Sequence, residues 1–398
     1  MLQFTPHAGN LPTSETLAIT ARANRMRAQG IDIAPFAAGE PDFDTAVHVK
    51  EAAIEAIRAG CTKYAPAAGI APLRAAVAER FRRNGHEGIG PEQTIVGTGA
   101  KGVLYTALQV LVGEGDEVLI PTPAWLSYPY MVQAAGGRSV FVETHPEDGY
   151  VLDPDRLRAA VTPRTKAILL NSPGNPTGTI QPDEIQAAVG RIALEHGLLV
   201  ISDEIYEHLV YAPARFRSFA ALAPQAREST LLVNGVSKAY AMTGWRIGYG
   251  GGPKELIQRM TRLQSHATSG TPEICQRAAL AALEGPMAEV KAMCATFGER
   301  RRVMYDALQA IEGLHCRLPD GAFYMLPDVR AHLGRRFEGK EIDSVATLAE
   351  MLIEHAHAAV VPGGVFEAPY AIRFSYACSD DHIRRGLARV KDFLAALD

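Results

Sequence analysis

Short apolar runs alternate with longer amphipathic stretches through the middle of the chain. The runs end in clusters of Gly, Pro, Asn, Ser or Asp and lie at residues 94–96, 118–120, 167–170, 198–201 and 231–233. Runs this short and apolar are typical of strands that are buried on both faces of a mostly parallel sheet. The stretches at 49–59, 102–112, 181–196 and 254–264 carry apolar residues at helical spacing. The pattern therefore predicts an α/β domain with helices on both faces of its sheet.

The pattern changes near residue 288. Long helical stretches follow at 299–311, 345–355 and 380–397, with short strand candidates at 322–326, 359–361 and 372–375. This pattern predicts a smaller α+β domain over 288–398, beside a large α/β domain over 46–287. The first 45 residues are helical near 18–29 and rich in turns at 38–42, and we expect the segment 1–45 to pack with the smaller domain.

Length and composition fit an ordinary globular protein and exclude several other classes. The chain has 398 residues, 47% hydrophobic and 21% charged, with a net charge of -4. This balance provides no field for polyanions, so we expect no nucleic acid partner, and no apolar run is long enough to predict a membrane span. The five cysteines form no CxxC pair and the histidines lack zinc spacing. We therefore expect reduced thiols, a cytoplasmic protein and no bound metal.

The segments that follow the five apolar runs carry most of the candidate chemistry. They are 97–101 (GTGAK), 121–125 (PTPAW), 171–178 (NSPGNPTG), 202–206 (SDEIY) and 234–238 (NGVSK). Ligands of open parallel sheets bind beyond the carboxyl ends of the strands. We therefore expect these segments to meet around one ligand.

Gly97, Gly99 and Gly102 form a GxGxxG pattern between a predicted strand and a predicted helix. The free amides of such a turn, aided by the helix dipole, bind phosphate. A dinucleotide site also needs an acidic residue about 20 residues further on, but the segment 118–124 has no carboxylate. The motif indicates a phosphate site, and a nicotinamide-dependent dehydrogenase that uses it remains an alternative from a different class.

Asp203 and Lys238 each follow an apolar run. A carboxylate buried at a sheet end needs a cationic partner, which a protonated ring nitrogen would supply. A partly desolvated lysine has a lowered pKa and can form a Schiff base with an aldehyde. Taken singly, Asp203 could cap a helix and Lys238 could lie on the surface. Together with the phosphate turn and the aromatic Trp125, they favour a cofactor site.

Three segments resemble the signatures of class I aminotransferases: 175–178 (NPTG), 202–206 (SDEIY) and 237–249 (SKAYAMTGWRIGY). The resemblance extends from 38–43 (AGEPDF) through 63–66 (KYAP) to 373–377 (RFSYA), and is closest to the bacterial aspartate/prephenate branch. It implies a fold-type I enzyme dependent on pyridoxal 5'-phosphate, usually a homodimer, that acts by a ping-pong mechanism. Its partners would be a small amino acid and a 2-oxo acid.

The resemblance also implies roles for residues around the cofactor. Lys238 would form the Schiff base and then carry a proton at the substrate's α carbon. Asp203 would hold the protonated ring nitrogen, which keeps the ring able to accept electrons. Tyr206 and Asn175 would donate hydrogen bonds to the ring oxygen, and Trp125 would stack on the ring.

The remaining implied roles concern anions. The phosphate would be held by Arg246, the amides around Gly99, Ala100 and Lys101, and the partner subunit's Tyr64. Arg373 would clamp the substrate's α-carboxylate with the two nitrogens of its planar fork. The other substrate contacts would be Asn175, the Gly39 amide, Trp125 and Lys101.

Two positions bear on details of the resemblance. Many family members have a phosphate-binding serine three residues before the lysine, where this chain has Gly235, and Ser237 is the nearby hydroxyl that could replace it. In the resembled branch a lysine at the position of Lys101 is associated with acidic substrates, so we expect an aspartate or glutamate type of donor. A helix start that faces solvent is the other interpretation of Lys101.

Several alternatives share parts of this site. A β-lyase, cyclase, oxidase or decarboxylase could use the same cofactor, as could an aromatic amino acid aminotransferase. The Arg373 clamp argues against decarboxylation, because it favours retention of the α-carboxylate. A non-catalytic regulator is disfavoured because no basic DNA-reading helix is appended.

Overall fold

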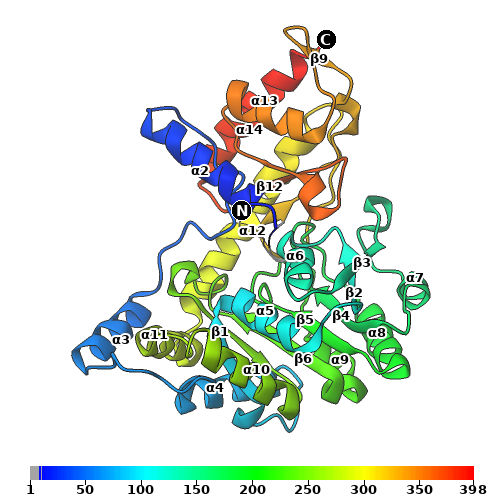
Figure 1. The fold of residues 1–398 in the computed structure, drawn as a ribbon. Coiled ribbons are helices and arrows are strands. Elements are labelled where there is room, and N and C mark those ends of the chain that lie inside the picture. The colour runs from blue at the N-terminus through cyan, green and yellow to red at the C-terminus, as the bar shows by residue number, and fades with distance from the viewer. Residues whose placement is uncertain (1–8, 10) are drawn as a thin grey trace, which may run out of the picture.

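The structure of the protein is a computed structural model that describes residue 9 and residues 11–398. Residues 1–8 and 10 of the segment expected at 1–45 lie outside the described residues. A seven-stranded sheet forms the centre of the larger group of elements (Figure 1). Its strands in spatial order are β1 (Thr94–Thr98), β7 (Ile247–Gly251), β6 (Thr230–Gly235), β5 (Leu199–Asp203), β4 (Thr165–Asn171), β2 (Glu117–Thr122) and β3 (Arg138–Glu143).

The sheet is mostly parallel, as predicted, and the exception is β7. It runs antiparallel to both of its neighbours, β1 and β6, so these two strands point in the same direction. The carboxyl ends of all five predicted strands therefore meet at one edge of the sheet. The sequence pattern missed β3, which lies at the sheet edge and has exposed positions, and β7, whose sequence IGYGG contains few large apolar residues.

Helices cover both faces of the sheet. Because successive residues of a strand point to opposite sides, each strand contributes side chains to the cores on both faces. In β4, Ala167 and Leu169 pack toward α5 (Gly99–Leu111), α6 (Ser127–Ala134) and α10 (Lys254–Ala267). Ile168 and Leu170 belong to the core on the other face. Its helices are α3 (Val47–Arg58), α4 (Ala71–Arg83), α7 (Pro154–Ala159), α8 (Asp183–His196), α9 (Phe219–Leu222) and α11 (Glu273–Glu284).

A second, smaller group of elements lies above the sheet in Figure 1. Its helices are α12 (Ala288–Gln309), α13 (Val345–His355) and α14 (Asp380–Ala395), and its strands are β8 (Tyr324–Met325), β9 (Arg336–Phe337), β10 (Lys340–Glu341), β11 (Val361–Pro362) and β12 (Ile372–Ser375). The helix α2 (Glu15–Ala28) packs through Ala23 with Val361 and Phe366 of this group. The domain boundaries at 45/46 and 287/288 stay a prediction.

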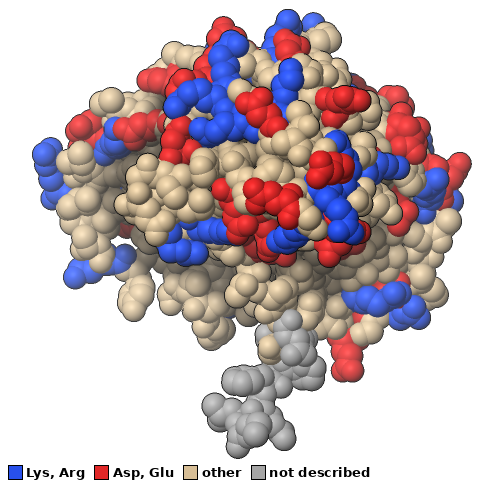
Figure 2. Space-filling view, turned by 90° about the horizontal axis from the view of Figure 1, so that it is seen from above, with Lys and Arg blue, Asp and Glu red and all other residues tan. Residues whose placement is uncertain are grey.

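The surface carries charges of both signs. Figure 2 shows Lys and Arg side chains interspersed with Asp and Glu on the face that it views. Elsewhere in the chain, Asp32 pairs with Arg385 and Arg389, with oxygen–nitrogen distances of 2.8 and 3.1 Å. None of the helices among the described residues is long and apolar enough to cross a membrane.

Candidate active site

A cavity of about 610 Å³ lies between the carboxyl edge of the sheet and the smaller group of elements. Its walls come from the segments after β1, β2, β4, β5 and β6, and from α2, β8 and β12. All of the residues predicted for the site except Gly99 and Tyr64 line this cavity. The structure therefore brings the segments at the strand ends together, as the sequence pattern predicted.

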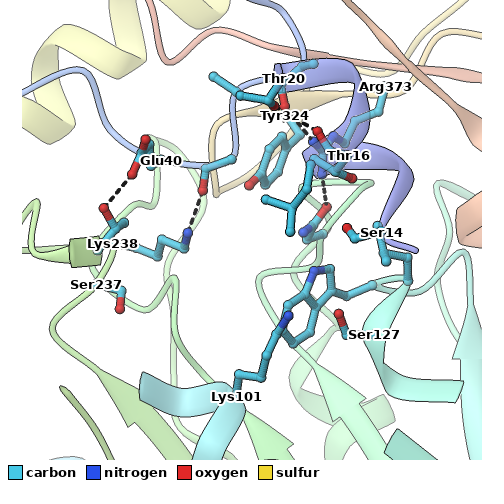
Figure 3. A pocket seen from close by; sticks show the side chains of 18 of the residues that line it. Ser14, Thr16, Thr20, Glu40, Lys101, Ser127, Ser237, Lys238, Tyr324 and Arg373 are labelled. Carbon is cyan, nitrogen blue, oxygen red and sulfur yellow. Dashed lines mark hydrogen bonds between the residues drawn. The ribbon is translucent and has the colours of Figure 1, made fainter. Parts of the chain in front are cut away.

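Lys238 lies in the turn after β6. Its Nζ donates a hydrogen bond to the carbonyl oxygen of Gly39 at 2.5 Å (Figure 3). Burial lowers the pKa of Lys238 to about 8, although the nearby carboxylates Glu40 and Asp203 act in the opposite direction. An amine with this pKa gives up its proton more readily than a surface lysine, which suits a nucleophile or a proton carrier.

Asp203 ends β5 and is buried. Its Oδ2 accepts a hydrogen bond from the Tyr128 hydroxyl at 2.8 Å, and its Oδ1 accepts one from the Ile205 amide at 3.2 Å. Burial raises its pKa to about 6, against the lowering effects of these two donors and of Lys238. Because a carboxylate can accept about four hydrogen bonds, Asp203 has capacity for a further cationic donor.

Arg373 reaches the cavity from β12 and is buried. Its Nη1 donates to Asn175 Oδ1 at 3.0 Å and its Nη2 donates to the Ala37 carbonyl at 3.3 Å. Its Nε is buried without a hydrogen-bond partner, and no carboxylate in the described part of the chain pairs with the guanidinium. A buried cation without a fixed anion is suited to bind the carboxylate of a ligand.

The start of α5 forms a cradle with β7 and Arg246. Gly99 has a φ of +72°, and a Cβ there would lie 2.4 Å from Arg246 Nη2. A Cβ at Gly248 would lie 2.0 Å from the backbone nitrogen of Ala100. Only glycine permits these approaches. The Gly99 amide donates to the Arg246 carbonyl at 3.0 Å. The amides of Ala100 and Lys101, in the first turn of α5, and the Arg246 guanidinium can therefore bind one anion together.

Lys101 lies on the opposite side of the cavity from Arg373 (Figure 3). Lys101 Nζ is 4.8 Å from the centre of the Trp125 ring, and the Trp125 ring packs edge-on against Tyr128 at 5.2 Å. Ser237 also lines the cavity and is buried. At Gly235 a Cβ would lie 3.1 Å from Gly248 Cα, so a serine would be crowded at that position.

A family model described as "Aminotransferase class I and II" matches residues 31–390. The chain belongs to this family. The family explains why a lysine, a buried carboxylate, an anion cradle and an unpaired arginine converge on one cavity. The protein is therefore a transaminase of fold type I, and its cofactor is pyridoxal 5'-phosphate.

The family assignment agrees with full-length relatives. An aspartate aminotransferase of Geobacillus stearothermophilus is 44% identical over 99% of this chain and 100% of its own. An aspartate/prephenate aminotransferase of Thermus thermophilus is 47% identical, with 94% of each chain covered. The crystal structure of an aspartate aminotransferase from Rhizobium meliloti is similar with a TM-score of 0.95 at 41% identity, covering 100% of both chains.

The cavity fits the family's cofactor on observations made in this chain. The buried Asp203 carboxylate can accept another donor, and the amides of Ala100 and Lys101 belong to the first turn of α5, in the same cavity as Arg246. Lys238 has a lowered pKa in the same cavity.

Tyr64, a predicted site residue, lies outside this arrangement. Its side chain is 91% exposed and does not line the cavity of its own chain. Its contact with a partner subunit's phosphate therefore stays a prediction.

The structure also adds residues that the sequence analysis missed. Tyr128 bonds Asp203, and Tyr324 in β8 lies beside Arg373 in Figure 3, with Thr16 and Thr20 of α2 nearby. Tyr128 follows Trp125 by three residues, and this spacing at a helix start was a usable signal. The position of Tyr324 in the cavity depends on the pairing of β8 with β12, which the sequence pattern does not predict.

Proposed function

We propose that this transaminase takes its amino group from a dicarboxylic amino acid, aspartate or glutamate, and passes it to a 2-oxo acid in a ping-pong cycle. One observation carries the proposal: among the cationic side chains that line the cavity, Arg373 and Lys101 lie on opposite sides. A dicarboxylic substrate would place its α-carboxylate on Arg373 and its distal carboxylate near the Lys101 ammonium. The names of the aspartate-type relatives support the same choice.

Lys238 would move the proton at the substrate's α carbon. Bound pyridoxal phosphate supplies an aldehyde for the amino nitrogen and a ring that accepts electrons from the α carbon. The lowered pKa of Lys238 leaves part of the amine neutral near pH 7, so it can accept a proton there. Its bond to the Gly39 carbonyl holds the amine in the cavity before a ligand enters.

The other cavity residues would bind and orient. Asp203 would hold the protonated ring nitrogen, and the hydroxyl of Tyr206 and the amide of Asn175 would donate to the ring oxygen. Trp125 would stack on the ring. The anion cradle of Gly99, Ala100, Lys101 and Arg246, with Ser237 nearby, would hold the phosphate. Asn175, Trp125 and the Gly39 amide would help Arg373 and Lys101 to hold the substrate.

The active form would be a cytoplasmic homodimer. The exposed Tyr64 would reach the phosphate in the partner's cavity, which would explain a tyrosine so fully exposed to solvent in one chain. Tyr64→Phe should then weaken cofactor binding by roughly tenfold through the loss of one hydrogen bond to a charged group. Equal cofactor dissociation constants for the variant and the wild type would remove the support for this contact.

The visible spectrum of the purified protein, with an assay of 2-oxo acid formation, tests the role of Lys238. Lys238→Ala should lack the visible absorption band of the Schiff base between Lys238 and the cofactor. Its turnover should fall by at least about a thousand-fold, because the nucleophile and the proton carrier are lost together. Lys254→Ala, at an exposed lysine that begins α10, serves as the control and should keep both. Wild-type turnover and an unchanged spectrum in Lys238→Ala would refute the proposed role of Lys238.

The choice of substrate is tested at Lys101. Lys101→Ser should lower kcat/KM for aspartate by roughly tenfold or more while leaving that for alanine nearly unchanged, since alanine has no distal carboxylate. An unchanged ratio of the two values would refute the proposed role of Lys101.

A further inference from the structure

Tyr324 lies where the substrate end and the cofactor end of the cavity meet. It begins β8, which pairs antiparallel with β12, and it faces Ser375, two residues beyond Arg373. Its side chain is 1% exposed, yet it lines the cavity, and Figure 3 shows its ring beside Arg373. The roles given above to the residues around it leave this tyrosine unexplained.

The Tyr324 ring supports the Arg373 guanidinium. The guanidinium carbon is 4.3 Å from the centre of the Tyr324 ring and 5.0 Å from that of Phe366. Aromatic faces attract a cation without providing a carboxylate that would compete with the substrate. The guanidinium of Arg373 can thus remain charged and available in a buried position.

The Tyr324 hydroxyl meets the Tyr206 hydroxyl. The two oxygens are 3.1 Å apart, and the rings are nearly perpendicular at 84°. Burial raises the pKa of both tyrosines, so both hydroxyls keep their protons and one must donate to the other. If Tyr206 donates its own proton to a ligand, its oxygen is free to accept from Tyr324.

The backbone before Tyr324 is tied to the larger group of elements. Gly321 donates its amide to the Gly178 carbonyl and Ala322 donates to the Leu209 carbonyl, each at 2.9 Å. The hydroxyls of Tyr211 and Tyr376 both donate to the Ala322 carbonyl. These bonds hold the entry to β8 in place, so the Tyr324 side chain has a fixed position between Arg373 and Tyr206.

We propose that Tyr324 is a positioning residue that couples the two ends of the active site, its ring holding the Arg373 guanidinium and its hydroxyl orienting the Tyr206 proton toward the cofactor. This inference rests on the proposed roles of Arg373 and Tyr206. Its two parts are separable, because phenylalanine at position 324 keeps the ring and removes the hydroxyl, whereas leucine removes both.

The hydroxyl is tested by the pH midpoint at which the visible band of the holoenzyme changes, measured without substrate. A hydrogen bond from the Tyr324 hydroxyl to the Tyr206 oxygen makes the Tyr206 hydroxyl a stronger donor to the cofactor. Because Tyr324→Phe loses this bond, it should raise the pH midpoint by roughly half a pH unit. Besides Tyr324, the charged groups Asp203 and Arg373 affect the pKa of Tyr206, and both remain in this variant. Tyr240→Phe is the matched control, since it also loses a buried hydroxyl that makes a bond, here to Met287, and Tyr240 does not line the cavity.

The ring is tested by the binding of maleate, a dicarboxylate without an amino group, to the holoenzyme. Tyr324→Phe should bind maleate like the wild type, and Tyr324→Leu should bind it roughly five- to twenty-fold more weakly. Wild-type affinity in the leucine variant would overturn the role of the ring. Equally weak binding in Tyr324→Phe would overturn it as well, because the loss of affinity would then follow from the hydroxyl.

Tyr206→Phe separates this inference from the proposed function beneath it. If Tyr206→Phe raises the pH midpoint and Tyr324→Phe does not, the coupling is refuted while the role of Tyr206 stands. If neither variant changes the pH midpoint, both the proposed role of Tyr206 and the coupling through Tyr324 are refuted. A rise in both, larger for Tyr206→Phe, supports the inference.

Discussion

Asp203, the last residue of β5, and Glu207, in the turn that follows, are both buried carboxylates, but their surroundings are opposite in kind. Asp203 faces the cavity and accepts two hydrogen bonds. Glu207 faces α4 and accepts from both Nε and Nη2 of Arg80, and from the amides of Asn84 and Asn234, at 2.6 to 3.0 Å. One short segment thus contains an incompletely bonded carboxylate and a fully bonded one.

The difference shows how this fold separates stability from function. A buried charge with all its partners within the protein fixes the backbone around it, and removal of one partner leaves a costly unpaired charge. A buried charge that lacks a partner raises the energy of the protein until a ligand supplies that partner. We infer that Glu207 anchors the segment and that Asp203 and Arg373 keep capacity for the cofactor and the substrate.

The largest expected effect that tests this comparison is that of Asp203→Asn. Turnover should fall by roughly a thousand-fold, because the variant has no negative charge for the ring nitrogen of the cofactor. The free energy of unfolding of the cofactor-free protein should stay the same or rise, since burial disfavours the ionised carboxyl. Urea denaturation and 2-oxo acid formation measure the two quantities, and Asp183→Asn, at an exposed carboxylate, is the control. A strong loss of stability would place Asp203 in the same class as Glu207.

The next effect is that of Arg80→Ala, with the opposite outcome. The variant leaves Glu207 buried without its cation and should lower the free energy of unfolding by about 3 kcal/mol. Turnover of the folded fraction at low temperature should stay within about twofold of the wild type, since Arg80 does not line the cavity. Arg83→Ala is the matched control on the same helix, because the Arg83 side chain is 77% exposed and pairs with Glu79 at the surface. Equal losses in the two variants would contradict the anchoring role of Glu207.

The smallest effect concerns Glu204, which lies between the two carboxylates. Burial, with a further contribution from the charge of Glu207, raises the pKa of Glu204 to about 8. A carboxyl whose pKa is raised by folding stabilises the protein below the unfolded value of 4.5, and this stabilisation is lost as the pH rises through the folded value. Stability of the cofactor-free wild type should therefore fall between pH 5 and 8, with Glu204 contributing about 1 kcal/mol per pH unit.

Glu204→Gln removes that contribution. Between pH 6 and pH 7, the free energy of unfolding of Glu204→Gln should rise by about 1 kcal/mol relative to that of the wild type. Denaturation curves at the two pH values give this difference directly. A difference that does not change with pH would show that Glu204 keeps an ordinary pKa.

The sequence predicted the cavity well because strand ends and local motifs are local features of the chain. Lys238, Asp203, Asn175 and Arg373 line the cavity as expected, and the five central strands lie where the apolar runs are. Their roles toward the cofactor and the substrate stay predictions. Polar residues directly after an apolar run indicate where a strand of a parallel sheet ends. The positions of ligand-binding residues at the strand ends can therefore be predicted without knowledge of the fold.

The features that the sequence did not predict depend on pairing between distant segments. Tyr324 enters the cavity because β8 pairs with β12, and β7 belongs to the sheet because its glycines allow close packing on α5. Bonds such as Lys238 to Gly39 join residues 199 positions apart. No local periodicity encodes such contacts, because they arise from the register and packing of the folded chain.

The cradle at the start of α5 limits where this cavity can vary. The chain tolerates no β carbon at Gly99 or Gly248 without displacing Arg246 or the backbone of Ala100, so this wall is made of main chain at its closest approach. The opposite side, formed by α2 and the smaller group of elements, presents side chains that can be exchanged without moving main chain. We therefore expect substitutions of side chains, on that side and at Lys101, to change the choice of substrate, whereas a β carbon at Gly99 or Gly248 would disturb the site for the cofactor's phosphate.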